Sequence, residues 1–210
     1  LEDLYLPYRP KKRTRAMIAR ERGLEPLADM ILNDTVTSGN PLDIAREYIS
    51  EEVPTPEDAI QGASDIVAEI VSDSADFRAT LRKRMWKEGF IQAELVEDNE
   101  HKDQFLQYNE YAEPVRQMPS HRILAVNRGE KLGALKLALT VPDESYIQYM
   151  VRGITNNEQS IFIDVKASAV ADAYKRLMFP ALERDIRNEL TESADEQAIK
   201  RSEERRVGKE

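Results

Sequence analysis

A long stretch near the end of the chain constrains the fold more than any other feature. From Asp164 to Leu190, apolar residues recur every three or four positions, which is the spacing of one face of an amphipathic helix. This face consists of Ala167, Val170, Ala171, Tyr174, Leu177, Met178, Leu182, Ile186 and Leu190. Pro180 lies inside the stretch and lacks the backbone N–H that a helix interior requires. The sequence therefore predicts a long helix that is kinked or divided near Pro180.

Shorter helices are marked by their start and stop signals. Thr14 can cap a helix that ends at Gly23, and Pro26 starts a second helix. Thr55 followed by Pro56 is a strong helix start, because threonine caps free N–H groups and proline suits the first turn. Further helices are predicted over residues 41–49, 77–87, 102–108 and 143–152. This tandem of short helices resembles helix-turn-helix packing.

A small β element is predicted in the middle of the chain. Residues 90–96 are β-branched and aromatic enough for a strand, and residues 123–126 are a second strand candidate. Residues 127–129 supply turn chemistry, so that residues 135–141 could return as the partner strand of a hairpin. Gly129 would provide a positive φ in this turn. The predicted fold class is mainly α and multi-helical, with a helix-turn-helix-like region, a small β-hairpin element and the long C-terminal helix.

The composition limits the classes of function. The net charge of −9 makes the chain a poor general binder of nucleic acid, since its overall field repels phosphate. Any such binding must therefore be local. The absence of cysteine excludes disulfides, thiolate metal sites and a cysteine nucleophile. No apolar run approaches the roughly 20 residues that span a bilayer, so we expect no membrane partner.

One dense basic cluster near the N-terminus could make a local contact. It interleaves aromatic residues with lysine and arginine, which is the chemistry of a phosphate-backbone contact. Arg128, at the tip of the predicted hairpin, could also touch RNA or a partner. The candidate nucleic-acid-binding residues are Tyr8, Arg9, Lys11, Lys12, Arg13, Arg15 and Arg128. The alternative is a solvated turn whose arginines pair with carboxylates of this acidic chain.

Other motifs give little sign of chemistry. The acidic pairs Glu51–Glu52, Glu57–Asp58 and Glu97–Asp98 are sequence neighbours, which alone do not make a catalytic or metal site. His101 and His121 have no second ligand at metal spacing. Phosphate-loop, nucleophile-elbow and dinucleotide motifs are missing from the sequence. We therefore expect no catalytic residue, no metal and no cofactor.

Three ordered blocks carry a family resemblance. They are LEDLYLPYRPKKRTRAMIARERGLEPLAD at the start, MPSHRILAVNRGEKLGALKLAL from Met118, and AYKRLMFPALERDIRNELTESADEQAIK from Ala173. Together they resemble the Tex family of bacterial RNA-binding transcription accessory proteins. The resemblance implies a helix-turn-helix-like domain within this region and a helical segment before it. It also implies an RNase H-like domain, a helix-hairpin-helix module and an OB-type RNA-binding domain beyond Lys200.

The resemblance divides the chain into four segments. Residues 1–118 would be a helical region, residues 119–163 a small β-containing segment, and residues 164–200 a long helix leading toward the RNase H-like domain. Residues 201–210, RSEERRVGKE, do not continue the family pattern and resemble the translated sequence of a sequencing adapter. We therefore exclude this tail from the fold prediction and expect it to pack against nothing.

The resemblance implies a cytoplasmic bacterial protein that binds RNA or DNA and acts alongside the transcription machinery. Our first interpretation is the helical scaffold portion of such a protein, with weak, non-specific nucleic-acid contact. The alternative is a protein–protein interaction scaffold that positions RNA-binding domains and does not itself contact nucleic acid. An enzyme is not expected. Charge geometry separates the first two, because a shared basic face favours nucleic acid and cations paired with carboxylates favour the scaffold.

Overall fold

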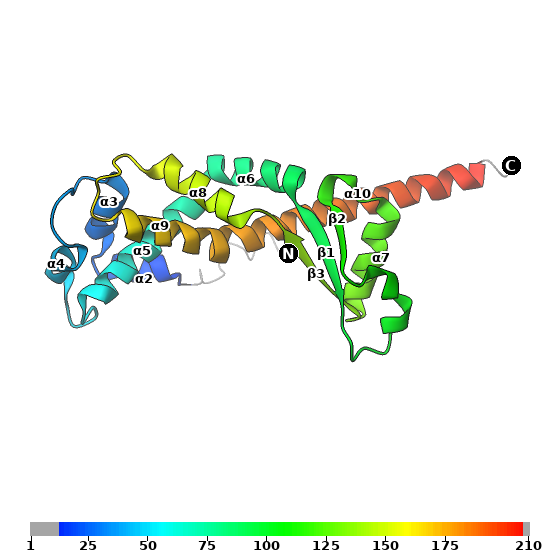
Figure 1. Cartoon of the computed structure of the whole chain (residues 1–210), viewed down its shortest axis with the longest axis horizontal. Helices are drawn as coiled ribbons and strands as arrows, with labels where there is room; N and C mark the ends of the chain where they lie inside the picture. Colours follow the sequence, from blue (N-terminus) through cyan, green and yellow to red (C-terminus); the bar gives the residue numbers. More distant parts are fainter. Residues whose placement is uncertain (1–12, 208–210) are drawn as a thin grey trace, which may run out of the picture. The chain divides into compact units, whose positions relative to one another are not determined.

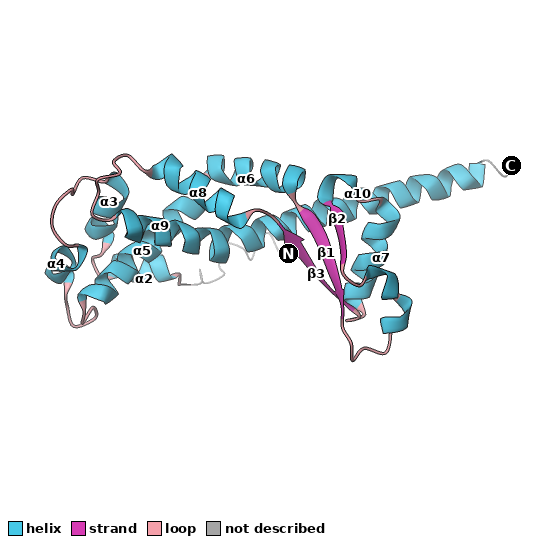
Figure 2. Cartoon of the chain, in the orientation of Figure 1, coloured by secondary structure: helices cyan, strands magenta, loops and turns pink. Residues whose placement is uncertain are grey.

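The computed structural model describes residues 13–207 of the chain. Helices dominate, and the strands form a three-stranded antiparallel sheet (Figure 2). The chain divides into two compact units, each made of two stretches of sequence. The first unit contains the residues up to Ser74 and Ile147–Leu177, and the second contains Ala75–Tyr146 and the residues from Met178 onward. The predicted fold class, mainly α with a small β element and a long C-terminal helical stretch, is confirmed.

Helix α5 (Pro56–Ser72) forms the centre of the first unit. Helices α2 (Arg15–Glu21), α3 (Glu25–Asn33), α4 (Pro41–Ala45) and α9 (Ile163–Asp172) pack against it (Figure 1). Its fully buried residues are Ala59, Ala63, Ile66, Val67 and Ala68. Because small alanines alternate with branched side chains on this helix, neighbouring helices can approach it closely.

The helices of the first unit begin and end where the local sequence predicts. The Thr14 hydroxyl accepts the Met17 N–H at 3.1 Å, and the Thr55 hydroxyl accepts the Asp58 N–H at 3.1 Å. Gly23 follows α2 with a φ of 76°, in the left-handed region that favours glycine. These caps satisfy backbone groups that a helix end leaves free.

The second unit is built on the sheet. Its strands are β1 (Phe90–Leu95), β2 (Tyr111–Pro114) and β3 (Leu135–Thr140), in the order β2-β1-β3. Ile91 is opposite Glu113 on one side and Leu139 on the other. Alternate side chains of β1 are buried, as expected for a sheet with one covered face.

Helices cover the sheet and link the two units along the chain. Helix α7 (Ser120–Lys131) packs against β3 and against α10 (Phe179–Val207), and α10 also contacts α6 (Ala75–Glu88). Helix α8 (Asp143–Ile154) begins in the second unit and ends in the first. Short 3-10 turns occupy Arg46–Tyr48, Lys102–Gln104, Leu106–Tyr108 and Val115–Gln117.

The predicted hairpin is wrong. Residues 123–126 and the supposed turn at 127–129 belong to helix α7, and β3 pairs with β1 instead. Gly129 has no positive φ; the glycine that ends the helix with φ 69° is Gly133. At Gly129 a Cβ would lie 2.5 Å from Cδ1 and 2.8 Å from Cγ of Leu135, so close packing favours glycine at this position.

The long C-terminal stretch changes its hydrogen-bond pattern near Pro180. After α9 the backbone forms a π-helix over Ala173–Met178, and α10 starts at Phe179. A π-helical segment is one of the usual ways in which a helix adjusts to a missing i→i−4 bond. The stretch is therefore not divided: it stays helical from Ile163 to Val207, and its hydrogen-bond pattern changes just before Pro180. Helix α10 continues to Val207, and Arg201–Glu204 are exposed on it, as expected for a tail that packs against nothing.

Candidate nucleic-acid interface

The predicted basic cluster falls only partly within the described residues. Tyr8, Arg9, Lys11 and Lys12 lie outside them. Arg13 is described and forms an ion pair with Glu21 of α2. The charge of this arginine is therefore offset by a carboxylate of the chain.

Arg15 begins helix α2 and is exposed. Its positive charge acts on Asp65 of α5. Burial raises the pKa of this carboxyl above its ordinary value, and the charges of Arg15 and Arg176 offset only part of that increase. Arg13 and Arg15 thus lie together at the start of α2.

Helix α2 is attached to α5 through Glu69, which binds the cap Thr14 and Arg20 of the last turn. The Arg20 guanidinium donates to Oε1 of Glu69 at 2.6 Å, and the Thr14 hydroxyl donates to Oε2 at 2.9 Å. The hydrogen bond from Arg20 outweighs burial and holds the pKa of Glu69 below its ordinary value. A charge-assisted pair of this kind orients both helices, so α2 is held against α5 at Thr14 and at Arg20.

Arg128 occupies a different setting from the one predicted. It is exposed in the last turn of α7, next to Lys131, and belongs to the second unit. A cation in this position is stabilised by the negative end of the helix dipole. Because it is not at a turn tip, the sequence argument for its contact with RNA loses its structural basis.

Helix α6 contributes two cations, Arg82 and Arg84, that are engaged within the second unit. Arg82 pairs with Glu189 of α10. Arg84 lies over the ring of Tyr146, 5.5 Å from its centroid, and the Tyr146 hydroxyl donates to Glu88 at 3.1 Å. Burial, reinforced by Glu88, raises the pKa of Tyr146 above its ordinary value. The charge of Arg82 is therefore offset by a carboxylate, while Arg84 lies against an aromatic ring.

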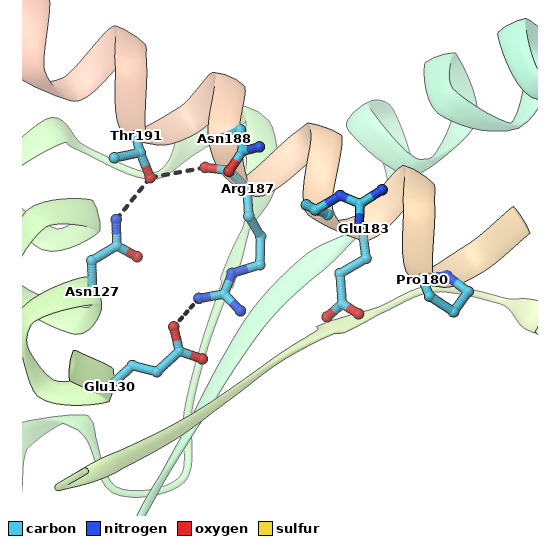
Figure 3. A pocket seen from close by; sticks show the side chains of 8 residues that line it. Asn127, Glu130, Pro180, Glu183, Arg187, Asn188 and Thr191 are labelled. Carbon is cyan, nitrogen blue, oxygen red and sulfur yellow. Dashed lines mark hydrogen bonds and ion pairs between the residues drawn. The ribbon is translucent and has the colours of Figure 1, made fainter. Parts of the chain in front are cut away.

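A polar groove of about 340 Å³ lies between α7 and α10 (Figure 3). It is lined by Asn127, Glu130, Pro180, Glu183, Arg184, Arg187, Asn188 and Thr191. Arg187 pairs with Glu130, and the Asn127 amide donates to the Thr191 hydroxyl at 2.8 Å. Sequence reasoning missed this groove because it assigned residues 123–126 to a strand. The recurrence of polar residues three or four positions apart from 183 to 191 was the available signal.

A buried ion pair in the first unit was also missed. Lys166 of α9 and Asp34, just after α3, both have side chains with 0% exposure, and Nζ lies 2.6 Å from Oδ2. The Lys166 ammonium also donates to the backbone oxygens of Leu32 at 2.9 Å and Ile154 at 3.0 Å. One side chain therefore connects the ends of α3 and α8 with α9.

Asp34 is stabilised in its ionised form. Burial raises its pKa, but hydrogen bonds from Lys166 and from the backbone N–H groups of Asn156 and Asn157 outweigh burial and hold the pKa below its ordinary value. The two N–H donors lie 2.7 and 3.3 Å from Oδ2. Lys166 and Asp34 are 132 residues apart in the sequence, so no local pattern points to the pair.

The acidic pairs and the histidines do not combine into a site. Asp58 accepts the Thr55 hydroxyl at 2.7 Å, and Glu97 pairs with Lys102. His101 lies 3.3 Å from Glu100, and His121 is exposed on α7. Within the described residues, no group of three or more histidines and acids could hold a metal ion. No helix in this part of the chain is both long and apolar enough to cross a membrane.

Comparison with known proteins gives the family. Residues 37–201 match the family model described as Tex central region-like. The chain is 39% identical over 215 residues to the transcriptional accessory protein Tex of Neisseria gonorrhoeae, covering 95% of this chain and 27% of that protein. It is 43% identical over 204 residues to the uncharacterized protein YdcI of Bacillus subtilis (strain 168), covering 95% and 28%.

A more distant relative extends beyond bacteria. The chain is 27% identical over 217 residues to the S1 RNA-binding domain-containing protein 1 of Homo sapiens, covering 95% of this chain and 21% of that protein. The chain thus spans about a quarter of the length of the curated relatives that it matches. Because the family model covers most of the chain, the chain belongs to the Tex family, and residues 37–201 form its central region.

Proposed function

We propose that this chain is the helical scaffold of a nucleic-acid-binding transcription accessory protein, and that it adds a weak, sequence-independent contact to phosphate. The proposal is supported by the relative named transcriptional accessory protein Tex and by the basic residues that precede α2. The residues proposed for the contact are Tyr8, Arg9, Lys11, Lys12, Arg13 and Arg15. RNA or DNA is the proposed ligand, the bacterial cytoplasm the location, and the transcription machinery a further partner.

The observation that carries the scaffold part is the attachment of α2 to α5. Thr14 and Arg20 both bind Glu69, so the chain that follows the basic residues is held in place. A phosphate contact made just before Thr14 would therefore be transmitted to a packed helical unit. A rigid support is what lets a weak contact position a larger ligand.

The alternative function is a protein-interaction scaffold without nucleic-acid contact. It is favoured by the pairing of Arg13, Arg82 and Arg187 with carboxylates. The net charge of −9 favours it as well. In this alternative, RNA would be bound by other parts of the full-length protein. For both functions we propose that this region carries no catalytic site.

A salt titration tests the proposed contact. Fluorescent RNA and duplex DNA are titrated with the parent chain and with the triple variant K11A/K12A/R13A. If all three side chains neutralise phosphates, the variant should bind every sequence more weakly and flatten the slope of log K against log salt by about 2 to 3. The expected parent affinity lies in the non-specific range, with Kd about 10⁻⁴ to 10⁻⁶ M.

A matched variant controls for net charge. The substitution K83A/K131A/K136A removes three exposed lysines of the second unit and changes the charge by the same amount. It should leave the slope close to that of the parent. An equal loss in both variants would show a general charge effect, and an unchanged slope in K11A/K12A/R13A would favour the protein-interaction scaffold. Circular dichroism of each variant shows whether the helices remain intact.

A further inference from the structure

One face of the three-stranded sheet is covered and the other is open. In β1 the residues Ile91 and Ala93 are buried, whereas Phe90, Gln92 and Glu94 are exposed. The pairing of β1 with its two neighbours extends this alternation across the sheet, because residues opposite each other point to the same face. The open face therefore consists of Phe90, Gln92, Glu94, Ala112, Pro114, Lys136, Ala138 and Thr140.

Phe90 is the only aromatic residue of the open face. It lies on β1, the central strand (Figure 1), and is 43% exposed. Its neighbours across the sheet are Pro114 and Thr140. The next neighbours on this face, Ala112 and Ala138, are small and exposed. A flat group can therefore lie against the Phe90 ring without meeting a large side chain beside it.

Gln92 is the next residue of β1 on the open face, about 7 Å along the strand from Phe90. Within residues 13–207 its side-chain amide has no hydrogen-bond partner, so its donor and its acceptor are both available. The charged residues Glu94 and Lys136 are opposite each other, so their charges offset. The part of the face around Phe90 and Gln92 is therefore uncharged, in a chain whose net charge is −9. It suits an uncharged group with hydrogen-bonding edges.

The size of the open face argues against a protein as its occupant. Three strands about 4.8 Å apart, over about 14 Å of strand length, give an area of roughly 200 Å². A specific protein interface buries about 800 Å² on each partner. A nucleobase matches the face better, because it is flat, stacks on aromatic rings and carries donors and acceptors at its edge.

We propose that Phe90 and Gln92 form a binding site for one unpaired base of a single-stranded nucleic acid. The base stacks on the Phe90 ring, and its edge bonds to the Gln92 amide. This inference deepens the proposed function and rests on it, because it names the form of nucleic acid that the chain prefers. A duplex offers no such base, since its bases are paired and stacked on one another. Stacking of a base releases no counterions, so this contact adds affinity without changing the salt slope.

Removal of the Phe90 ring tests the stacking. Fluorescent single-stranded RNA and duplex DNA are titrated at low salt with the parent chain, F90A and F90Y. F90A should bind the single strand about fivefold or more weakly, which is the lower end of the effect of removing a stacking aromatic. Its affinity for duplex DNA and its salt slope should equal those of the parent. F90Y keeps an aromatic ring and should bind like the parent.

Two further variants define the site. Q92L keeps the volume of Gln92 but removes the amide, and should weaken single-strand binding about 2- to 10-fold. L106A is the matched control, because Leu106 is an exposed apolar residue of the second unit that lies outside the open face. It should leave the affinity unchanged. Circular dichroism of each variant checks that the fold is intact.

The outcomes separate this inference from the proposed function. Single-strand binding by F90A that equals the parent's would overturn the base site, as would an equal loss in L106A or an equal loss for duplex DNA. If F90A has no effect while K11A/K12A/R13A flattens the salt slope, the inference fails and the phosphate contact stands. A parent chain that binds neither nucleic acid overturns both.

Discussion

Replacing Lys166 by methionine tests how the first unit is held together. Methionine fills a similar unbranched volume but removes the ammonium. The change deletes the hydrogen bonds to Asp34, Leu32 and Ile154, of 2.6, 2.9 and 3.0 Å. It also leaves the Asp34 carboxylate buried without its cation.

The structure sets the size of the effect. Removing one partner of a buried ion pair costs about 3–5 kcal/mol, because the other charge stays buried. Asp34 keeps the backbone N–H groups of Asn156 and Asn157, which offsets part of that cost. We therefore expect the lower end of the range, about 3 kcal/mol, which is a large fraction of the 5–15 kcal/mol typical of a domain.

Hydrogen exchange is the appropriate assay. The only tryptophan, Trp86, belongs to the second unit and does not report on Lys166. Exchange of the protected amides of α3 and α9 should become about a hundredfold faster in K166M, which is the equivalent of about 3 kcal/mol. K175M, an exposed lysine of the first unit, is the matched control and should change the free energy by less than about 0.5 kcal/mol.

A double variant separates the ion pair from general packing. Asn at position 34 tolerates the left-handed backbone, where φ is 55°. If Asp34 and Lys166 are coupled, D34N/K166M should cost clearly less than the sum of the two single changes. K166M with no more effect than K175M, or strictly additive costs, would refute the reasoning.

Three smaller changes test caps, packing and charge. T55A should cost about 1 kcal/mol by removing the cap of α5, while T55S should keep it, as measured by urea denaturation. G129A should destabilise the second unit by about 1–3 kcal/mol, because its Cβ would meet Leu135, and Trp86 fluorescence should report this. The pKa of Glu69 is held below its ordinary value of 4.5. Its contribution to the free energy of unfolding should therefore be complete above pH 4.5 and should be lost as the pH falls below that value. In E69Q the acid-induced loss of stability should therefore be smaller in a pH series of urea melts.

Helix boundaries were predictable because their signals are local. Thr55 and Pro56 mark the start of α5 in two adjacent residues, and the structure places the cap there. The change of hydrogen-bond pattern just before Pro180 follows in the same way from a missing donor. The helix-turn-helix resemblance and the segment boundaries remain predictions.

The wrong strand at 123–126, the missed groove and the missed buried ion pair have a common physical origin. A four-residue apolar run such as 123–126 fits either a strand or a helix, and in the structure its Ile123 and Val126 are buried as part of α7. The groove between α7 and α10 could not be predicted without that helix. Lysine is ordinarily exposed, so the sequence gives no sign that Lys166 is buried. Only the folded chain brings Asp34 to it.

The salt dependence of nucleic-acid binding by the parent chain tests the central claim most directly. Log K is measured against log salt for duplex DNA with the 210-residue chain. Two or three phosphate contacts from the segment before α2 predict a linear dependence with a slope of about −2 to −3. Binding that is undetectable at low salt would contradict the contact, and a slope steeper than about −6 would contradict the scaffold role by requiring a far larger interface.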